Sequence, residues 1–123
     1  MTITIDEFKK LEIRIGHILS VEKVPDTEKL LKLSVDFGDE TPRQIVSGIA
    51  GFFPDTQTLV GKKCAFAYNL EPRTIRGLES QGMILAVNGE KNAEKSSTTD
   101  ASGESFFSLL ETSHDVVPGS TVK

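Results

Sequence analysis

Two arginines and several amide and hydroxyl side chains lie close together between residues 69 and 83. This stretch connects one apolar segment, residues 64–68, with another, residues 83–87. A connection that only had to turn would need Gly, Pro, Asn or Asp, and would not need Arg73 and Arg76 as well. Guanidinium groups can donate paired hydrogen bonds to phosphate, and amide and hydroxyl groups can bond sugar hydroxyls or base edges. The stretch is therefore a candidate binding loop. Its polar groups are Asn69, Arg73, Arg76, Ser80 and Gln81.

A second group of cations, Lys29 and Lys32, lies earlier in the chain, at and just after a polar turn over residues 25–29. In a five-stranded OB-type barrel, the loops after strands 1 and 4 frame the ligand face. If residues 25–29 and 70–80 are these loops, the lysines lie on one side of a groove and the arginines on the other. Their charges would then converge on a phosphate backbone. Few aromatic residues lie at these loops, so little base stacking is expected.

The charge of the chain leaves a second interpretation open, in which these cations are solvated loop charges. Their neighbours Glu28, Glu71 and Glu79 would partly neutralise them, and on residue types alone this alternative is the stronger one. The net charge of −4 also argues against strong non-specific binding of nucleic acid. However, the chain through residue 80 holds 12 acidic and 11 basic residues, whereas the rest holds 6 and 3. A local basic patch in the first two-thirds is therefore compatible with the composition.

No catalytic or metal site is predicted. The run from Arg14 to His17, Arg-Ile-Gly-His, resembles the His-Ile-Gly-His signature of class I aminoacyl-tRNA synthetases. It lies in a strand pattern, however, without a Lys-Met-Ser-Lys-Ser partner or room for a nucleotide-binding domain. His17 and His114 are far apart in the pattern, and Ser80 has no histidine base nearby in the sequence. No phosphate-binding glycine loop occurs either. Catalysis is the weaker hypothesis, and no cofactor is implied.

Length and composition describe one ordinary globular domain. The 123 residues are 37% hydrophobic and 26% charged, enough for a single core without disulfides. The single cysteine, Cys64, alternates with Phe66 and Tyr68, which favours a buried small hydrophobe over a reactive thiol. One cysteine also suits a reducing compartment. The first ten residues are polar and no long apolar run follows, so we expect neither a signal peptide nor a membrane span, and a cytoplasmic location.

Alternating apolar residues predict five strands. Residues 11–24 form a long strand in which Gly16 suggests a bulge or bend, and Thr4 with Glu7 gives a capping box for a helical turn at residues 4–10. Residues 88–104 contain no large apolar residue and are expected to form a flexible polar loop. A mixed connection with a helical turn at 56–60 joins the third and fourth strands. Five short strands with such a connection predict an all-β OB-fold barrel. The other strands are expected at 31–37, 43–47, 62–70 and 83–87.

Several runs of residues resemble the tRNA-binding domain family, in order along nearly the whole chain. The most specific are Val46 to Ile49, Asn69 to Arg73, and Arg76 to Met83, which ends in Ser-Gln-Gly-Met. The family includes the C-terminal domain of bacterial methionyl-tRNA synthetase, its free-standing beta-subunit forms, and homodimeric structure-specific tRNA-binding proteins. Weaker likenesses cover the first two strands and a closing turn, at residues 11–16, 26–33 and 117–120.

The resemblance implies a single OB-fold domain that binds folded tRNA with little sequence preference and has no catalytic activity. It implies a barrel over residues 11–87, a C-terminal extension at 105–123 that mediates homodimerisation, and methionyl-tRNA synthetase as a partner. Met83 opens an apolar strand, so a role in the core or as a loop anchor is the alternative for it. The tRNA contacts implied by the resemblance are Lys29, Lys32, Asn69, Arg73, Arg76, Ser80, Gln81 and Met83.

A competing class is a chaperone of the same fold. Secretion chaperones share the barrel and the dimer, and would bind unfolded polypeptide in a groove between protomers. They generally lack the Ser-Gln-Gly-Met run, which is intact here. The resemblance therefore favours tRNA binding.

Overall fold

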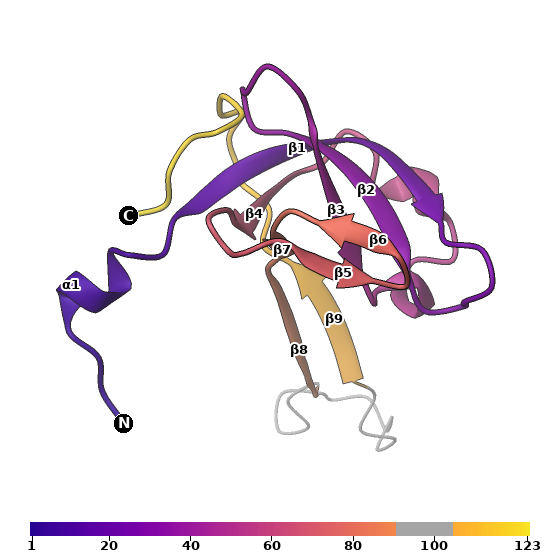
Figure 1. Cartoon of the computed structure of the whole chain (residues 1–123), viewed down its shortest axis with the longest axis horizontal. Helices are drawn as coiled ribbons and strands as arrows, with labels where there is room; N and C mark the ends of the chain where they lie inside the picture. The colour runs from indigo at the N-terminus through magenta and orange to yellow at the C-terminus, as the bar shows by residue number, and fades with distance from the viewer. Residues whose placement is uncertain (91–104) are drawn as a thin grey trace, which may run out of the picture.

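Five antiparallel strands form one curled sheet, an OB-like half-barrel (Figure 1). The computed structural model describes residues 1–90 and 105–123. Neighbouring strands in the sheet follow the order β3-β2-β1-β4-β7. This arrangement confirms the predicted fold class. The five strands are β1 (Ile13–Lys23), β2 (Leu31–Asp36), β3 (Arg43–Ser47), β4 (Lys63–Ala67) and β7 (Met83–Ile84).

The core lies on the concave side of this sheet. Leu31, Leu33 and Val35 of β2 are fully buried and alternate with half-buried polar residues, as the sequence pattern predicts. Burying aliphatic side chains of this size contributes roughly 1.5–3 kcal/mol each, so β2 is a main source of stability. The largest fully buried side chains are Phe66, Ile18, Leu31, Leu33, Ile45, Leu59, Val35 and Cys64.

The long first strand bends, but at a different residue from the one predicted. Its pairing with β2 shifts register between Ile18 and Ser20, which turns Ile18 into the core and leaves Leu19 exposed. Gly16 is regularly paired with Cys64 and forms no bulge. A Cβ atom at Gly16 would lie 2.5 Å from a Val35 methyl group, so close packing explains this glycine.

In the part of the chain that the structure describes, three short helices accompany the strands. α1 (Ile5–Phe8) begins with the predicted capping box: the Glu7 N–H donates to the Thr4 hydroxyl over 3.1 Å, and the Thr4 N–H donates to the Glu7 carboxylate. η1 (Ala50–Phe52) and η2 (Thr56–Thr58) lie in the connection from β3 to β4, where a helical turn was predicted. Among the described residues, no helix is long and apolar enough to cross a membrane.

The C-terminal part of the chain returns to the sheet. β8 (Ala86–Glu90) and β9 (Ser105–Leu109) form a two-stranded ribbon that projects from the barrel (Figure 1). Residues 88–90 are thus in a strand and not in the predicted flexible loop; its other residues, 91–104, lie outside the described residues. After β9 the chain runs along β1, where the Ile15 N–H donates to the Ser120 carbonyl over 2.8 Å. The Val122 N–H likewise donates to the Ile13 carbonyl.

Cys64 should not react with thiol reagents while the protein is folded. Its side chain is fully buried, and burial raises the pKa of its thiol to about 11, so almost no thiolate forms at neutral pH. We expect an aromatic disulfide reagent to modify no thiol in the native protein and one thiol per chain in denaturant. Rapid modification without denaturant would contradict the buried position.

Candidate nucleic-acid interface

The stretch predicted as a polar loop is largely a β-hairpin. β5 (Arg73–Ile75) pairs antiparallel with β6 (Leu78–Ser80), and Figure 1 shows the hairpin lying across the main sheet. Two residues, Arg76 and Gly77, connect its strands, with φ angles of 53° and 79°. Positive φ at both positions defines a type I′ turn, which usually has Asn-Gly or Asp-Gly. Because Arg-Gly is an uncommon turn sequence, the pattern indicated only a loop.

Arg76 occupies a position that disfavours its residue type. Left-handed backbone costs a non-glycine residue roughly 1–2 kcal/mol relative to the right-handed form. In return, the turn places the Arg76 side chain in solvent at the tip of the hairpin. Arg73 is also exposed and begins β5, opposite Ser80. The two predicted arginines therefore lie on one solvent-exposed hairpin, available to an anionic ligand.

Ser80, by contrast, lies inside the protein. It is 4% exposed, accepts a hydrogen bond from the Val46 N–H over 3.0 Å, and donates to the Gly82 carbonyl over 3.0 Å. A hydroxyl with these partners holds the hairpin against β3. The predicted contact of Ser80 with RNA does not fit this buried position, and the residue has a structural role.

Gln81, the residue after Ser80, also forms hydrogen bonds with β3. Its N–H donates to the Gln44 carbonyl over 2.8 Å, and its side-chain oxygen accepts from the Gln44 N–H over 3.1 Å. Two residues later β7 begins and pairs with β4 at the other edge of the sheet. Ser80 to Gly82 thus link the two edge strands of the half-barrel, β3 and β7.

Asn69 fixes the start of β1. Its side-chain oxygen accepts from the Glu12 N–H, and its amide donates to the Lys10 carbonyl, both over 2.7 Å. The side chain is exposed, but these two bonds give it a structural task that the resemblance did not indicate. A contact of Asn69 or Gln81 with RNA stays a prediction.

The two predicted lysines have different surroundings. Lys29 is exposed in its turn, and its carbonyl accepts from the Ala50 N–H just beyond β3. Because the bonds of Ser80 and Gln81 make β6 antiparallel to β3, the hairpin tip reaches this same end of β3. Lys29 and Arg76 are therefore at one end of the sheet. Lys32 is half-buried in β2 and forms an ion pair of 3.1 Å with Glu22.

Met83 is not a core residue, because 47% of it is exposed. It lines a small hollow beside the hairpin together with Leu70, Arg73 and Ile75. The structure thus brings Met83 and Arg73 together on the surface. A contact of Met83 with RNA remains a prediction that this position permits.

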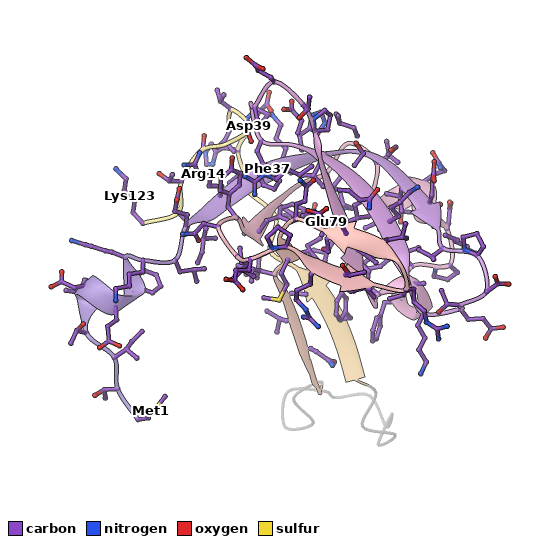
Figure 2. All side chains as sticks on the ribbon, in the orientation of Figure 1. Met1, Arg14, Phe37, Asp39, Glu79 and Lys123 are labelled. Carbon is purple, nitrogen blue, oxygen red and sulfur yellow. The ribbon has the colours of Figure 1, made fainter. Side chains whose placement is uncertain are left out.

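The sequence did not indicate a cluster of two arginines on one aromatic ring. The guanidinium carbon of Arg43 lies 3.6 Å from the centre of the Tyr68 ring, and that of Arg14 lies 4.3 Å from it. Figure 2 shows Arg14 near Phe37 and Asp39. These residues are distant in sequence, and only the pairing of the strands together with the curl of the sheet brings them to one place, so spacing gave no signal.

Hydrogen bonds fix this cluster. The Tyr68 hydroxyl donates to the Asp39 carboxylate over 2.6 Å, and this bond raises the pKa of Tyr68. The guanidinium of Arg14 is bonded to Glu12, which raises the pKa of Arg14. Both tyrosine and arginine therefore keep their protons at neutral pH. The cluster presents arginines of fixed orientation at the surface.

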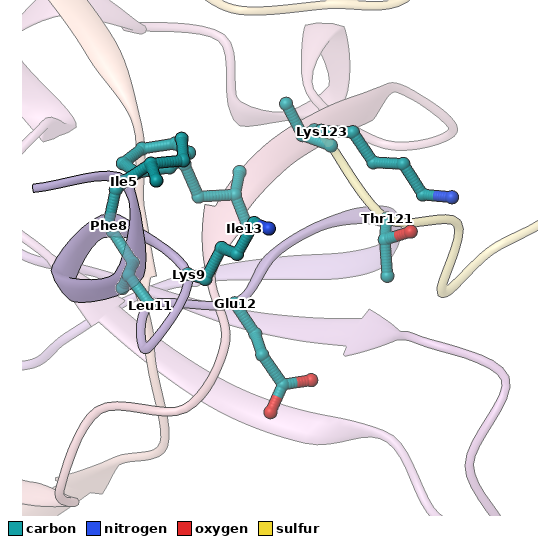
Figure 3. A pocket seen from close by; sticks show the side chains of 9 residues that line it. Ile5, Phe8, Lys9, Leu11, Glu12, Ile13, Thr121 and Lys123 are labelled. Carbon is teal, nitrogen blue, oxygen red and sulfur yellow. The ribbon is translucent and has the colours of Figure 1, made fainter.

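An apolar hollow lies elsewhere, between α1 and the C-terminal residues (Figure 3). Ile5, Phe8 and Leu11 line one side of it, and Val122 lines the other. All four side chains are exposed, and α1 buries none of its residues in the chain. Within residues 1–90 and 105–123, no group of His, Cys, Asp and Glu side chains is arranged to hold a metal ion.

A model of the family described as "Putative tRNA binding domain" matches residues 13–119. The chain belongs to this tRNA-binding domain family. The match covers every strand of the barrel and the β5–β6 hairpin, and it ends at residue 119, just before Ser120. The resemblance seen in the sequence is thereby confirmed.

Methionine–tRNA ligases share this domain. The chain is 49% identical to the ligase of Chloroherpeton thalassium over 86 residues, which are 70% of this chain and 12% of the ligase. It is 50% identical to the ligase of Methanospirillum hungatei over 101 residues, 82% of this chain and 15% of that one. The chain thus spans about an eighth of the length of these tRNA-binding domain relatives.

Two solved structures have the same fold over the whole chain. A methionyl-tRNA-synthetase-related protein from Pyrococcus horikoshii is 35% identical, with a TM-score of 0.80 over 100% of this chain and 99% of that one. The chaperone CsaA from Bacillus anthracis has a TM-score of 0.74 over the full length of both chains, but at 21% identity. The likeness to CsaA shows the fold alone.

Proposed function

We propose that this tRNA-binding domain binds the folded body of tRNA with little sequence preference, and that it has no catalytic activity of its own. The observation that carries the proposal is the type I′ hairpin, which holds Arg76 in a costly backbone conformation at an exposed tip. Arg73 on the same hairpin and Lys29 at the same end of the sheet add charge. Phosphates spaced along a folded RNA suit cations carried on a rigid surface.

We further propose that the domain assists methionyl-tRNA synthetase in the cytoplasm. Its relatives of that name contain the matching region as a small part of a much longer chain. A tRNA-binding domain beside a catalytic unit raises the local concentration of tRNA at that unit, by the arithmetic of linked binding sites. The domain would therefore lower the tRNA concentration needed for aminoacylation without taking part in the chemistry.

A tRNA titration at several salt concentrations tests the proposal. We expect the affinity for an intact tRNA to fall steeply with salt and to exceed the affinity for an unrelated RNA hairpin at equal salt. Equal affinity for both RNAs would overturn it. A parallel assay measures suppression of the aggregation of an unfolded protein; activity there without tRNA binding would favour the chaperone class instead.

We also propose that two copies form a homodimer through the apolar hollow beside α1 (Figure 3). An unfilled apolar surface with exposed Ile5 and Phe8 favours association over contact with water. The family resemblance implies dimerisation through residues 105–123, and the proposed face adds α1 to the last residues of that extension.

The oligomeric state of an Ile5→Ser variant tests this face. Light scattering should give a dimer for the parent protein and a monomer for Ile5→Ser, whereas Leu19→Ser should stay dimeric. Leu19 is the matched control because it is an exposed aliphatic residue on β1 that does not line the hollow. A dimeric Ile5→Ser variant would exclude this face as the interface.

A further inference from the structure

Arg43 is held rigidly at the junction of two surface hollows. Its guanidinium carbon lies over the Tyr68 ring, and its Nη1 donates to the carbonyls of Tyr68 and Gln81, over 2.7 and 3.2 Å. It lines one hollow with polar residues of β1, β2 and β3, and another with residues from Tyr68 to Pro72. An extended ligand that enters both hollows must therefore pass over Arg43. The first hollow is lined by Ser20, Glu22, Lys32, Leu33, Ser34, Pro42, Arg43 and Gln44.

One edge of this guanidinium is unused. Within the part of the chain that the structure describes, the Nε and Nη2 groups of Arg43 make no hydrogen bond. That edge presents two parallel N–H donors, the geometry that binds a phosphate through paired bonds. The Arg43 side chain is 27% exposed and lines both hollows, so part of it is in contact with solvent there.

The nearest charge to that edge is a carboxylate that is not bonded to it. The Asp39 Oδ2 atom lies 3.9 Å from the Arg43 Nε, too far for a hydrogen bond, and instead accepts from the Tyr68 hydroxyl. It attracts the guanidinium weakly and would repel a phosphate that approached the same edge. Asp39 therefore opposes the binding of an anion while it holds Tyr68 in place.

From this geometry we infer that Arg43 is a further phosphate-binding residue of the tRNA site and that Asp39 lowers its affinity by competing for the same edge. The inference rests on the proposed tRNA function and adds to it a residue and an opposing charge. It predicts that removing the negative charge of Asp39, by a substitution that keeps the shape of the side chain, should improve tRNA binding. A purely structural Arg43–Asp39–Tyr68 cluster would give no such gain.

The experiment compares tRNA affinity of the full chain with that of Asp39→Asn, Glu40→Gln and Arg43→Lys at about 0.1 M salt, chosen because ion contacts are strong there. Asparagine keeps the shape and can still accept from Tyr68. Glu40→Gln is the matched control, since it removes the same charge from the next exposed residue. Thermal unfolding of each variant establishes that it is folded.

We expect Asp39→Asn to bind tRNA about 3- to 10-fold more tightly, because it removes a charge close to the Arg43 edge. Glu40→Gln should bind less than about twofold more tightly, because solvent and salt screen the charge that it removes. Arg43→Lys keeps the charge but loses the paired donors, so its affinity should fall about 5- to 10-fold. An Asp39→Asn variant no tighter than Glu40→Gln, or a folded Arg43→Lys variant with parental affinity, would overturn the inference and leave the proposed function intact. Absence of tRNA binding by the parent chain would overturn both.

Discussion

Replacing Arg76 with asparagine should weaken tRNA binding about tenfold at about 0.1 M salt, because one phosphate contact is lost. The same change should leave the fold unchanged or more stable by up to about 1 kcal/mol, since asparagine adopts the left-handed backbone more easily than arginine does. Binding and stability would thus move in opposite directions. A tRNA titration over several salt concentrations, paired with urea unfolding, measures both quantities.

The salt dependence identifies the contact. Loss of one phosphate contact should reduce the slope of log affinity against log salt by about one. Lys10→Asn is a suitable control, because it removes one exposed positive charge just after α1, away from the hairpin and outside the lining of the apolar hollow. If both variants lower the affinity equally, the effect belongs to net charge and Arg76 makes no specific contact.

Replacing Gly82 with alanine should destabilise the protein by about 2–4 kcal/mol, the sum of backbone strain and a steric clash. Gly82 has a φ angle of 146°, and a Cβ atom there would lie 3.0 Å from the Ala67 carbonyl oxygen and 2.9 Å from the end of Ile45. The Ile45 side chain can move, but the carbonyl belongs to β4 and cannot move without breaking the pairing with β7. Urea unfolding measures the loss.

Gly77→Ala separates the two causes. Gly77 also has a positive φ angle, 79°, but among the described residues no atom beyond its own and those of its two chain neighbours lies within 4 Å of a Cβ placed on it. This variant should lose only about 1–2 kcal/mol, the cost of left-handed backbone alone. Equal losses in the free energy of unfolding for the two variants would show that the steric clash at Gly82 contributes nothing.

Those parts of the fold that depend on one strand's own pattern were predictable. Leu31, Leu33 and Val35 alternate without interruption, so both the existence of β2 and its buried face follow from the sequence. β1 was harder, because its two halves bury different faces on either side of Leu19. Only pairing with β2 decides where such a shift occurs, and the glycine in the strand pointed to the wrong residue.

The exposed cations of the candidate site were predictable from the sequence, but the hydrogen bonds that join the hairpin to β3 were not. Arg73 and Arg76 are exposed as expected, since an arginine in a short polar stretch has little opportunity to be buried. Ser80 has the same sequence surroundings yet is buried, because its partner Val46 lies on a strand 34 residues away. A single sequence carries no signal for that distance, and the same applies to Arg43 on Tyr68.

The bonds between β1 and the last residues of the chain have a consequence for the order in which the protein is made. The Gly119 N–H donates to the Ile15 carbonyl, and the Val122 N–H donates to the Ile13 carbonyl. A ribosome that has synthesised the first strand must add roughly a hundred more residues, at about 5–20 per second, before those partners exist. One edge of β1 is therefore unpaired for several seconds during translation, and this stretch is the first place where a chaperone or a neighbouring nascent chain could bind.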